Sequence, residues 1–416
     1  MLGSPSPHHQ PGSPSAVSPS RTSSPRRPSV GARPPHAVHV LGGAGAVDGA
    51  EGPSAGTAAH ARSLARGLAA RGVRVTVCAR QDAALQDAFA DTGADFVPLH
   101  GRTEAEAVAA LRVVCGDADL VHAHGAHAGF LAALALGSRR HGVPLVVTWH
   151  PRPDPAARTE AARDLVARLL TRRVARAATV VLGATTALVD AARRSGARDA
   201  RLAPAPIPVP GTGTGQPADD EDVLRHKVRA GIGALDRPLV LAVGRLDGRS
   251  GHETALTASR AWRRLDPTPL LGVAGEGPQR TALQQRIDRE MLPVRLLGRR
   301  EDALALLAGA DVALLPGRCQ GRSLVAQEAL RAGVPLVAAD GGDVPELVGD
   351  AALLVPHGDA DSLSAAVTVL LTDPAARAAL SRAGRARART WPTEDDAAAQ
   401  VLSVYDETLA AAARHR

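Results

Sequence analysis

Short apolar runs alternate with amphipathic segments along most of the chain. Residues 312–315 and 336–339 are apolar and carry no charge, as expected of strands that are buried on both faces of a sheet. Between them, residues 323–331 have apolar side chains at helical spacing, and Gly333 and Pro335 end that helix. Two strand–helix units in succession predict a parallel sheet whose loops after the strands open on one crevice.

The same alternation recurs in both halves of the chain, so we expect an α/β protein. In the first half the predicted strands are residues 37–41, 73–79, 96–99, 119–123, 144–148 and 179–182. In the second half they are residues 239–243, 270–274, 294–297, 312–315 and 336–339. The predicted helices are residues 58–71, 105–112, 126–140, 161–177, 187–195, 303–310 and 323–331, a short helix opened by Pro345, and residues 363–371, 375–383 and 394–412.

Two segments interrupt this alternation and divide the chain. Residues 1–35 are rich in Ser, Pro and Arg and lack the apolar region of a secretory signal, so we expect a disordered tail or a start codon assigned too early. Residues 204–220 read PAPIPVPGTGTGQPADD, without periodicity, which predicts a linker. The expected organisation is a tail at 1–35, a first domain at 36–203, the linker at 204–220, a second domain at 221–385 and a C-terminal helical segment at 386–416.

Charge and cysteine usage exclude some classes of protein. The formal net charge is +7, and four of the positive charges lie in residues 1–35, where there is no acid, which leaves +3 for the rest. That charge is too small to indicate a nucleic-acid partner. The three cysteines are scattered without metal or redox spacing, so we expect a reducing, cytoplasmic setting. No apolar run approaches the length of a membrane span.

The loop before the 323–331 helix is the first candidate for chemistry. A helix N-terminus offers free backbone N–H groups and the positive end of a dipole, which suit a phosphate. Glu328 lies one to two turns into the helix, where it can accept hydrogen bonds from a sugar hydroxyl. Paired carboxylates of a hydrolase are not evident. Gly43, Gly45 and Asp48 form a dinucleotide fingerprint that lacks its third glycine, which makes a dehydrogenase the least favoured function.

Several positions in the second half fall at the spacing of a known pattern. They are Gln320, Gly321, Leu324, Glu328, Ala329, Gly333, Pro335, Gly341, Gly342 and Glu346. This pattern resembles that of family 4 retaining glycosyltransferases (glycosyl transferases group 1), which have the GT-B fold. The resemblance implies two Rossmann-like domains whose parallel sheets face a central cleft, the first on the acceptor side and the second binding the donor. It also implies that the C-terminal helix, at 386–416, crosses back to the first domain. One departure is that Gln320 stands where the family has the first acidic residue of a Glu-x7-Glu pair.

Two further loops of the second half extend the resemblance. Residues 244–246 match the family's G-R-L motif, whose arginine, here Arg245, pairs with the donor diphosphate. A planar guanidinium suits that task because it binds two phosphate oxygens at once. The family then has a Lys-Gly pair, where this chain has Ser250 and Gly251, and the adjacent Arg249 either substitutes for the lysine or leaves a gap. Residues 275–278 match a G-x-G-P turn.

The first half of the chain resembles the same family. Gly56, His60, Leu64, Ala65, Leu68, Arg71 and Gly72 match its opening helix. The resemblance implies that Gly56 lets the backbone approach donor and acceptor, and that His150 points into the cleft beside the transferred sugar. For His122 and His124 we expect instead a structural role, in which they bond loop backbone at a strand end.

Together these resemblances imply a retaining glycosyltransferase that moves a sugar from a UDP- or GDP-linked donor to an unknown acceptor hydroxyl, with no metal and no cofactor beyond the donor. The implied partners are the nucleotide sugar and a small-molecule, glycan or lipid-linked acceptor, without nucleic acid. The expected catalytic residues are His150 and Arg245. The expected donor-binding residues are Gly56, Arg245, Arg249, Ser250, Gly277, Gln320, Gly321, Arg322, Ser323, Leu324 and Glu328.

Alternatives remain open at this point. Ser250 and Gln320 replace charged family positions, so the chain could be a catalytically weakened or non-catalytic GT-B protein that binds nucleotide sugar or a partner. A sugar-nucleotide epimerase on the same fold is a further alternative. The Arg-rich helix at 161–177 either contacts an anionic membrane surface, at the cytoplasmic face, or is a solvated helix face.

Overall fold

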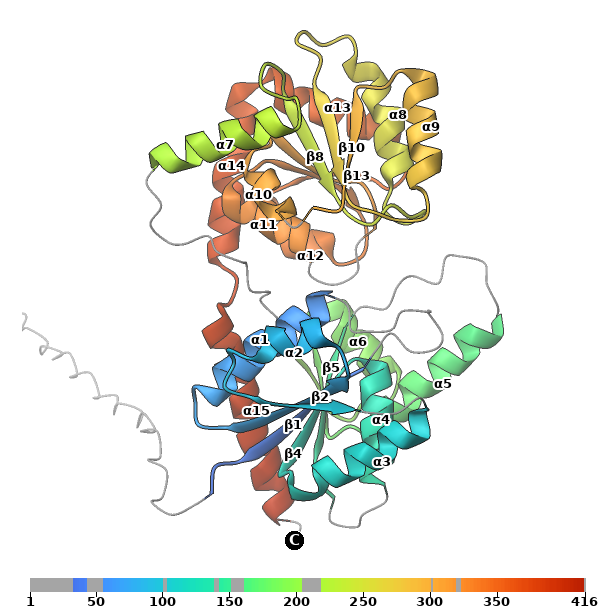
Figure 1. Cartoon of the computed structure of the whole chain (residues 1–416), viewed down its shortest axis with the longest axis vertical. Helices are drawn as coiled ribbons and strands as arrows, with labels where there is room; N and C mark the ends of the chain where they lie inside the picture. The colour runs from blue at the N-terminus through green and yellow to red at the C-terminus, as the bar shows by residue number, and fades with distance from the viewer. Residues whose placement is uncertain are drawn as a thin grey trace, which may run out of the picture. The chain divides into compact units, whose positions relative to one another are not determined.

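The computed structural model describes residues 33–42, 55–99, 103–137, 142–150, 161–203, 218–300, 302–318 and 323–414. Within these residues the chain forms two parallel β-sheets, one in each half (Figure 1). The expected α/β class is therefore confirmed, whereas a cleft between the two halves stays a prediction. Most of the predicted tail and residues 204–217 of the predicted linker lie outside the described residues.

The first half holds a seven-stranded sheet in the order β3-β2-β1-β4-β5-β6-β7, with every neighbouring pair parallel. Its strands are β1 (His36–Leu41), β2 (Arg74–Arg80), β3 (Asp95–Leu99), β4 (Leu120–His124), β5 (Leu145–Trp149), β6 (Val180–Gly183) and β7 (Ala200–Leu202). Its helices are α1 (Ala55–Ala69), α2 (Ala83–Phe89), α3 (Glu104–Val114), α4 (Ala126–Leu136), α5 (Ala161–Ala177) and α6 (Thr186–Arg194), with a 3-10 turn η1 (Cys115–Asp117).

The second half holds a six-stranded sheet in the order β10-β9-β8-β11-β12-β13, again with parallel neighbours. Its strands are β8 (Leu239–Val243), β9 (Leu270–Ala274), β10 (Val294–Gly298), β11 (Val312–Leu315), β12 (Leu336–Asp340) and β13 (Leu353–Pro356). Its helices are α7 (Ala218–Gly231), α8 (His252–Trp262), α9 (Arg280–Glu290), α10 (Ala303–Ala308), α11 (Leu324–Ala332), α12 (Val344–Val348), α13 (Ala360–Thr372) and α14 (Pro374–Arg389). The last helix of the chain is α15 (Glu394–Arg414).

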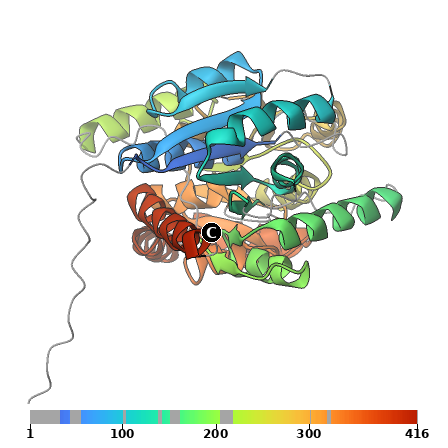
Figure 2. The same ribbon diagram turned by 90° about the horizontal axis from the view of Figure 1, so that it is seen from below.

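Alternate residues of the central strands enter separate hydrophobic cores on the two faces of each sheet. In β1, Val38 and Val40 pack with α3, α4, α5 and α6, whereas Ala37 and Leu41 pack with α1, α2 and α15. Because both faces are covered, the strands are apolar throughout, as the sequence pattern predicted. Helices on both sides of the first sheet are visible in Figures 1 and 2.

The second sheet is covered in the same way. Leu239 and Leu241 of β8 pack with α7, α10, α11, α12 and α14, and Val240 and Ala242 pack with α8, α9 and α13. Each half is therefore a doubly wound sandwich with its own core. In such sheets ligands bind outside the carboxyl ends of the strands, where the strand order reverses. That point lies between β1 and β4 in the first sheet and between β8 and β11 in the second.

The C-terminal helix α15 packs on the first half, as the resemblance implied. Ala398 lies against Gly67 of α1 so closely that a side-chain carbon at Gly67 would overlap it. The hydroxyl of Ser63 donates to Glu394 at 2.6 Å, and Tyr405 is buried in the same core. The helices α1 and α15, which are far apart in sequence, thus pack in one hydrophobic core.

Some elements differ from those predicted. Residues 218–220, placed in the linker, begin α7, and α14 continues past the predicted boundary at residue 385. Seven of the elements in the described residues were not predicted: α2, α7, α8, α9, β7, β13 and the 3-10 turn η1. The strands β7 and β13 have three and four residues and lie at sheet edges.

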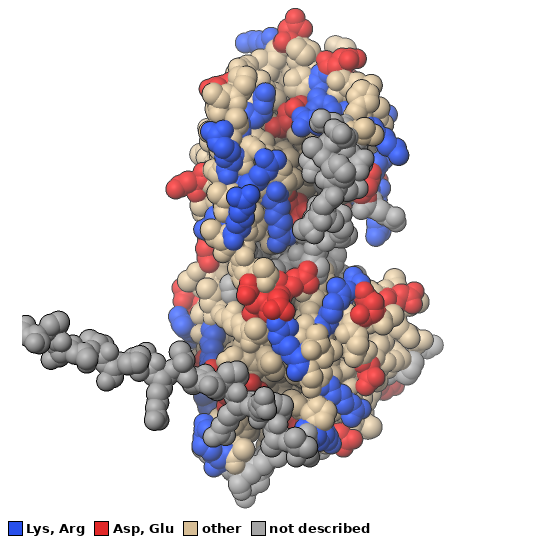
Figure 3. All heavy atoms as spheres, turned by 90° about the vertical axis from the view of Figure 1, so that its left-hand side faces the viewer, with Lys and Arg blue, Asp and Glu red and all other residues tan. Residues whose placement is uncertain are grey.

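Arginines gather on the side of the second half that α14 covers (Figure 3). Arg385 donates to the carbonyl oxygen of Ala332 at the end of α11, and Arg387 donates to those of Glu346 and Leu347 in α12. These guanidinium groups satisfy carbonyls at the negative ends of helices. Their charge is therefore used within the fold.

Across the part of the chain that the structure describes, no individual helix has the length and apolar composition needed to cross a membrane. The segments Ala360–Thr372 and Pro374–Arg414 satisfy that criterion only as a pair, with a bend of 101° between them.

Candidate functional site

Three loops meet at the carboxyl ends of β8, β9 and β11, at the reversal point of the second sheet. The loop after β8 is hydrogen-bonded to the loop after β9, since the Leu246 amide donates to Glu276 and the Gln279 amide donates to Leu246, both at 3.0 Å. A side-chain carbon at Gly277 would lie 2.7 Å from the Leu246 carbonyl carbon, and one at Gly317 would lie 2.6 Å from the Arg249 carbonyl oxygen. The glycines are needed because three backbones touch here. We call these residues, 244–251, 275–279 and 316–318, the loop platform.

Asp247 holds the first of these loops in shape. Its Oδ1 accepts from the Arg249 amide at 3.0 Å, from the Ser250 amide at 3.1 Å and from the Ser250 hydroxyl at 2.8 Å. Burial alone would raise the pKa of Asp247, but these hydrogen bonds and the charge of Arg249 together hold the pKa below its ordinary value. The Ser250 hydroxyl thus donates its proton to Asp247 and helps to shape the loop, while its role in donor binding stays a prediction.

Two cations stand on the loop platform. Arg245 is 72% exposed with its Nε 3.9 Å from Asp247, and Arg249 is 50% exposed with its Nη2 3.8 Å from the same carboxylate. Such long, solvated ion pairs contribute little stability and leave the guanidinium groups able to turn toward a ligand. The backbone carbonyl of Arg245 is hydrogen-bonded to Nε2 of the buried His252, which fixes the base of its side chain.

Helix α11 begins beside β11 with Ser323 as its N-cap. The Ser323 hydroxyl accepts from the Ala326 amide at 3.2 Å, and Leu324 is the first helical residue. Glu328 is 6% exposed and pairs with Arg331 at 3.1 Å. Burial raises the pKa of the Glu328 carboxyl, although the Arg331 charge lowers it in part. Gln320, Gly321 and Arg322, expected to bind the donor, lie outside the described residues.

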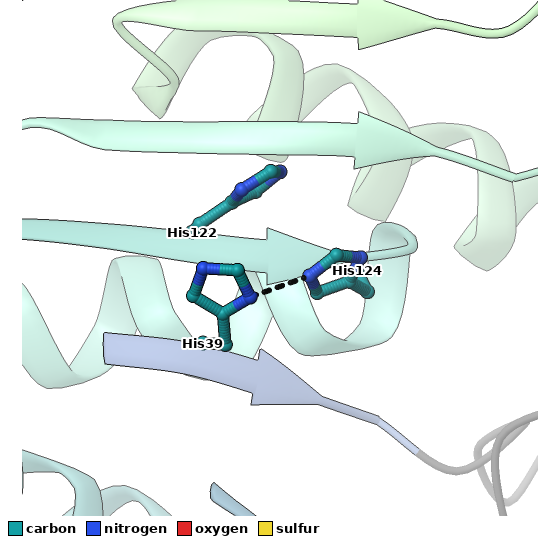
Figure 4. Close-up of side chains that lie close together, drawn as sticks. All are labelled: His39, His122 and His124. Atoms are coloured by element: carbon teal, nitrogen blue, oxygen red, sulfur yellow. Dashed lines mark hydrogen bonds between the residues drawn. The ribbon is translucent and has the colours of Figure 1, made fainter. Parts of the chain in front are cut away.

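A second constellation lies at the reversal point of the first sheet. His39 on β1 pairs in register with His122 on β4, and Leu41 pairs with His124. Side chains two residues apart share a face of a strand, so the three imidazoles lie together on the face that α1 and α15 cover (Figure 4). All three are buried, with at most 2% of each exposed.

These imidazoles form a hydrogen-bonded network with a helix 283 residues away in sequence from β4. The Tyr405 hydroxyl on α15 is bonded to Nδ1 of His122 at 2.6 Å and to Nε2 of His39 at 3.0 Å. His39 Nδ1 lies 3.2 Å from His124 Nε2, and His122 Nε2 is bonded to the Thr148 hydroxyl at 2.7 Å. The prediction that His122 and His124 bond loop backbone is therefore wrong, because their partners are side chains of β1, β5 and α15.

His150 and His60 extend this cluster toward the end of β5. The His150 ring lies 6.0 Å from that of His124 and 5.7 Å from that of His60 on α1. Part of the His150 residue is exposed, whereas its Nε2 is buried and has no hydrogen-bond partner among the described residues. Gly56 is partly buried in the first turn of α1.

All five imidazoles are neutral near pH 7. Burial lowers the pKa of His39 to about 3, that of His60 to about 4 and that of His150 to about 3. Burial, and then the neighbouring imidazoles, lower the pKa values of His122 and His124 well below the ordinary value. A charged imidazole in this setting would lose its hydration and repel its neighbours.

Sequence reasoning missed Asp247, His39 and Tyr405. A histidine inside an otherwise apolar strand was a visible signal for His39, as was the His-x-His spacing at 122 and 124. The strand order that places these residues side by side was not available from the sequence.

Comparison with known proteins supports both halves of this description. The family model described as "Glycosyl transferases group 1" matches residues 226–387, and "Glycosyl transferase 4-like domain" matches residues 55–208. The structure of HepE from Anabaena, solved in complex with UDP, superposes with a TM-score of 0.71 at 19% identity, covering 90% of this chain and 100% of that chain. The two doubly wound halves thus define a protein of the GT-B fold.

Sequence similarity to two curated glycosyltransferases identifies the family of the chain. The chain is 30% identical to alpha-D-kanosaminyltransferase of Streptomyces kanamyceticus over 270 residues, which is 62% of this chain and 69% of that protein. It is 39% identical to glycogen synthase of Mycobacterium tuberculosis over 171 residues, so the match spans 39% of this chain and 41% of that enzyme's length. The chain belongs to the glycosyl transferases group 1 family, the family 4 glycosyltransferases.

Proposed function

We propose that the chain is a retaining glycosyltransferase that moves a sugar from a UDP- or GDP-linked donor to an acceptor hydroxyl. The observation that carries this proposal is the pair of exposed cations, Arg245 and Arg249, on the loop platform of the second sheet. In the transfer, the bond between the anomeric carbon and a diphosphate oxygen breaks, and a bond to the acceptor oxygen forms on the same face of the sugar. The acceptor proton leaves with the diphosphate.

Charge stabilisation on the leaving diphosphate is the main task of the protein in this reaction. Negative charge grows on the diphosphate as the glycosidic bond breaks, so fixed positive groups lower the barrier. Arg245 would bind two phosphate oxygens, and Arg249 would supply the second cation that the family takes from lysine. The N-terminus of α11 adds backbone amides and the positive end of its dipole. These groups make a metal unnecessary for the transfer.

The remaining predicted residues have supporting roles. Glu328, one turn into α11, would accept hydrogen bonds from the donor ribose, and Ser323 keeps the first turn of that helix in place. His150 and Gly56 lie in the first half and would face the transferred sugar. His150 is suited to this role because it is a neutral imidazole at a strand's carboxyl end.

The donor proposal is tested by binding of UDP and GDP to the Arg245→Ala variant. Loss of one charged hydrogen-bonding group costs about 1.5–3 kcal/mol, so affinity should fall about 10–100-fold. Arg260→Ala is the matched control, because Arg260 is an exposed arginine of α8 that pairs with Glu290. Equal affinity of the wild type and Arg245→Ala would contradict the proposal. Retention is tested separately, by the anomeric configuration of the product in NMR spectra.

A second candidate function is binding without catalysis. The observation that favours it is Ser250, whose hydroxyl is held by Asp247 where the family has a lysine for the donor phosphate. Incubation of the purified chain with UDP- and GDP-sugars and a cell extract separates the two. Donor consumption that disappears in Arg245→Ala supports the transferase, whereas nucleotide binding without any consumption supports the second function.

We also propose that the protein is cytoplasmic and contacts an anionic membrane surface through α5. Cys78 and Cys115 are buried thiols, which suits a reducing compartment. Leu165, Val166 and Leu169 of α5 are 54–58% exposed, and Arg172 and Arg173 of the same helix are exposed. An apolar strip flanked by cations is typical of a helix that lies in a membrane interface. In a flotation assay, anionic vesicles should carry the wild-type protein but not the double variant Leu165→Ser/Leu169→Ser. Neutral vesicles should carry neither protein. If anionic vesicles carried both proteins equally, the membrane contact through α5 would be contradicted.

A further inference from the structure

The histidine trio of the first sheet has the arrangement of a metal-binding site. His39, His122 and His124 each offer a ring nitrogen, and these nitrogens lie within 4.8 Å of one another. Two of the histidines are at positions i and i+2 of one strand, and the third is on the neighbouring strand directly opposite, so the sheet backbone sets their spacing. Rigid strands hold ligand atoms more precisely than loops do.

The distance between two of the nitrogens fits a tetrahedral metal. Zinc binds histidine nitrogen at 2.0–2.1 Å, so two nitrogens on a tetrahedral zinc lie about 3.4 Å apart. His39 Nδ1 and His124 Nε2 are 3.2 Å apart. Small movements of these two rings would therefore admit a zinc ion between them, and His122 would complete the set of three.

The surroundings favour neutral imidazoles with fixed tautomers. A metal on Nδ1 of His39 leaves the ring proton on Nε2, where Tyr405 oxygen lies at 3.0 Å to accept it. His122 can likewise donate from Nδ1 to Tyr405 at 2.6 Å while its Nε2 exchanges the Thr148 hydroxyl for the metal. Hydrogen bonds from the second nitrogen orient histidine ligands and raise their basicity. Nδ1 of His124 is buried without a partner among the described residues, so this ligand would carry its ring proton without the support that Tyr405 gives to the other two.

We propose that His39, His122 and His124 bind one divalent zinc-type ion, which ties β1, β4 and, through Tyr405, the C-terminal helix α15 together. Imidazole nitrogen suits zinc, cobalt and nickel, while calcium and magnesium prefer oxygen ligands. The ion has a structural role in the first half and takes no part in the proposed sugar transfer, whose donor groups are on the second sheet. The proposal therefore stands independently of that function.

The test uses the full chain without a histidine tag, stripped with a chelator and then titrated with Zn²⁺ or Co²⁺. We expect about one bound metal per chain by elemental analysis, visible absorption bands for the cobalt form, and a higher Tm that the chelator reverses. His122→Gln and His39→Gln should abolish this binding. Tyr405→Phe keeps all three ligands and should weaken affinity about 10–100-fold.

His36→Gln is the matched control, because His36 is a buried histidine of the same strand whose ring is bonded to Thr76. It should bind metal like the wild type. Absence of stoichiometric metal in the wild type overturns the proposal whether or not the variants fold. Binding that survives His39→Gln and His122→Gln overturns it as well, since the metal would then lie elsewhere.

Discussion

Asp247 shows how a single carboxylate can shape the loop that we propose binds the donor diphosphate. Its carboxylate accepts hydrogen bonds from the backbone amides of Arg249 and Ser250 and from the Ser250 hydroxyl. These bonds fix the turn of the loop from which the side chains of Arg245 and Arg249 project. Ser250 stands where the family has a lysine, and its amide and hydroxyl take part in this internal network. The position of the cations therefore depends on a residue that would not contact the donor.

Asp247→Asn should destabilise the protein at neutral pH. The variant loses the charge that accepts three hydrogen bonds, which we expect to cost about 1–3 kcal/mol. The folded state lowers the pKa of Asp247 below its ordinary value of 3.8, so the ionised form stabilises the fold above that pH. That contribution is lost as the pH falls through the lowered pKa. Urea unfolding should therefore separate wild type and variant at pH 7 and bring them together in strong acid.

The control for this prediction is Asp236→Asn, which removes the same charge from an exposed turn position. Its unfolding free energy should match that of the wild type at pH 7. Equal destabilisation by both variants would show that net charge, and not the loop network, is responsible.

Glu328 should make donor binding sensitive to mild acid. Burial raises the pKa of its carboxyl, so protonation occurs at a higher pH than for an ordinary glutamate. The protonated form has lost one acceptor for the ribose hydroxyls, and UDP or GDP affinity should weaken as the pH falls through the raised pKa. The effect on stability has the opposite sign, because ionising a buried carboxyl as the pH rises costs folding free energy.

Calorimetric titration of the nucleotide between pH 4.5 and pH 8, in about half-unit steps, measures this dependence. Glu328→Gln should bind more weakly at pH 8 and show a flatter profile. Glu407→Gln, at an exposed glutamate of α15 outside the loop platform, should keep the wild-type profile. Parallel profiles for wild type and Glu328→Gln would place the titrating group elsewhere.

At the scale of elements, the contact between α1 and α15 determines how the end of the chain is held. Gly67 and Ala398 allow the two helices to approach closely, and the Ser63 to Glu394 hydrogen bond lies beside them. At such a close helix contact there is no space for a larger side chain at either position. The close packing therefore requires glycine at position 67, although alanine in a helix interior would stabilise the helix by about 1 kcal/mol.

Gly67→Ala should lower the stability in spite of that helix preference. Overpacking costs about 1–3 kcal/mol, which exceeds the gain, so thermal unfolding should show a lower Tm. Ala398→Gly in the same chain should restore most of the loss, because it removes the carbon that the new methyl meets. Gly116→Ala adds a methyl with no heavy atom within 4 Å and should leave the Tm unchanged. A stabilised Gly67→Ala protein would contradict the close contact.

Periodicity predicted most strands of the two sheets and missed several helices of the second half. The predicted bounds of β8, β9, β11 and α5 coincide with the observed ones, because these segments are apolar runs or carry clear helical spacing. Helix α7 begins with Ala218 and four acidic residues, 219–222, after a Pro/Gly-rich segment, so its start resembles a linker. In the edge strand β7, Arg201 pairs with Asp199 and Glu407, and a strand of three residues is too short to show a pattern of its own.

Some residues of the two candidate sites were predicted from the sequence, whereas others became visible only in the structure. Arg245, Ser323 and Glu328 were found from local sequence spacing, and the structure places all three at or beside the reversal point of the second sheet. Tyr405 lies 366 residues from His39 in sequence, so its part in the histidine network could not follow from any local pattern. Contacts of that kind depend on strand order and helix packing, which periodicity does not specify.

At the scale of the whole molecule, each doubly wound half places its chemistry at the same topological point. The loop platform follows β8 and β11, and the histidine trio lies on β1 and β4, so both stand where the strand order reverses. One half offers exposed cations and helix-end amides, whereas the other offers buried neutral imidazoles. The physical chemistry of the two points predicts that they respond to different ligands.

Hydrogen–deuterium exchange on the full chain can separate these two responses. Saturating UDP or GDP should slow exchange in residues 244–251 and in the first turn of α11, because the ligand suppresses local opening of exposed loops. Zn²⁺ should instead slow exchange in β1, β4 and α15, the elements that the proposed ion connects. Arg245→Ala should remove the first effect and spare the second, and His122→Gln should do the reverse. If either variant removed both effects, the two points would be coupled, and the assignment of separate roles to the two halves would have to be abandoned.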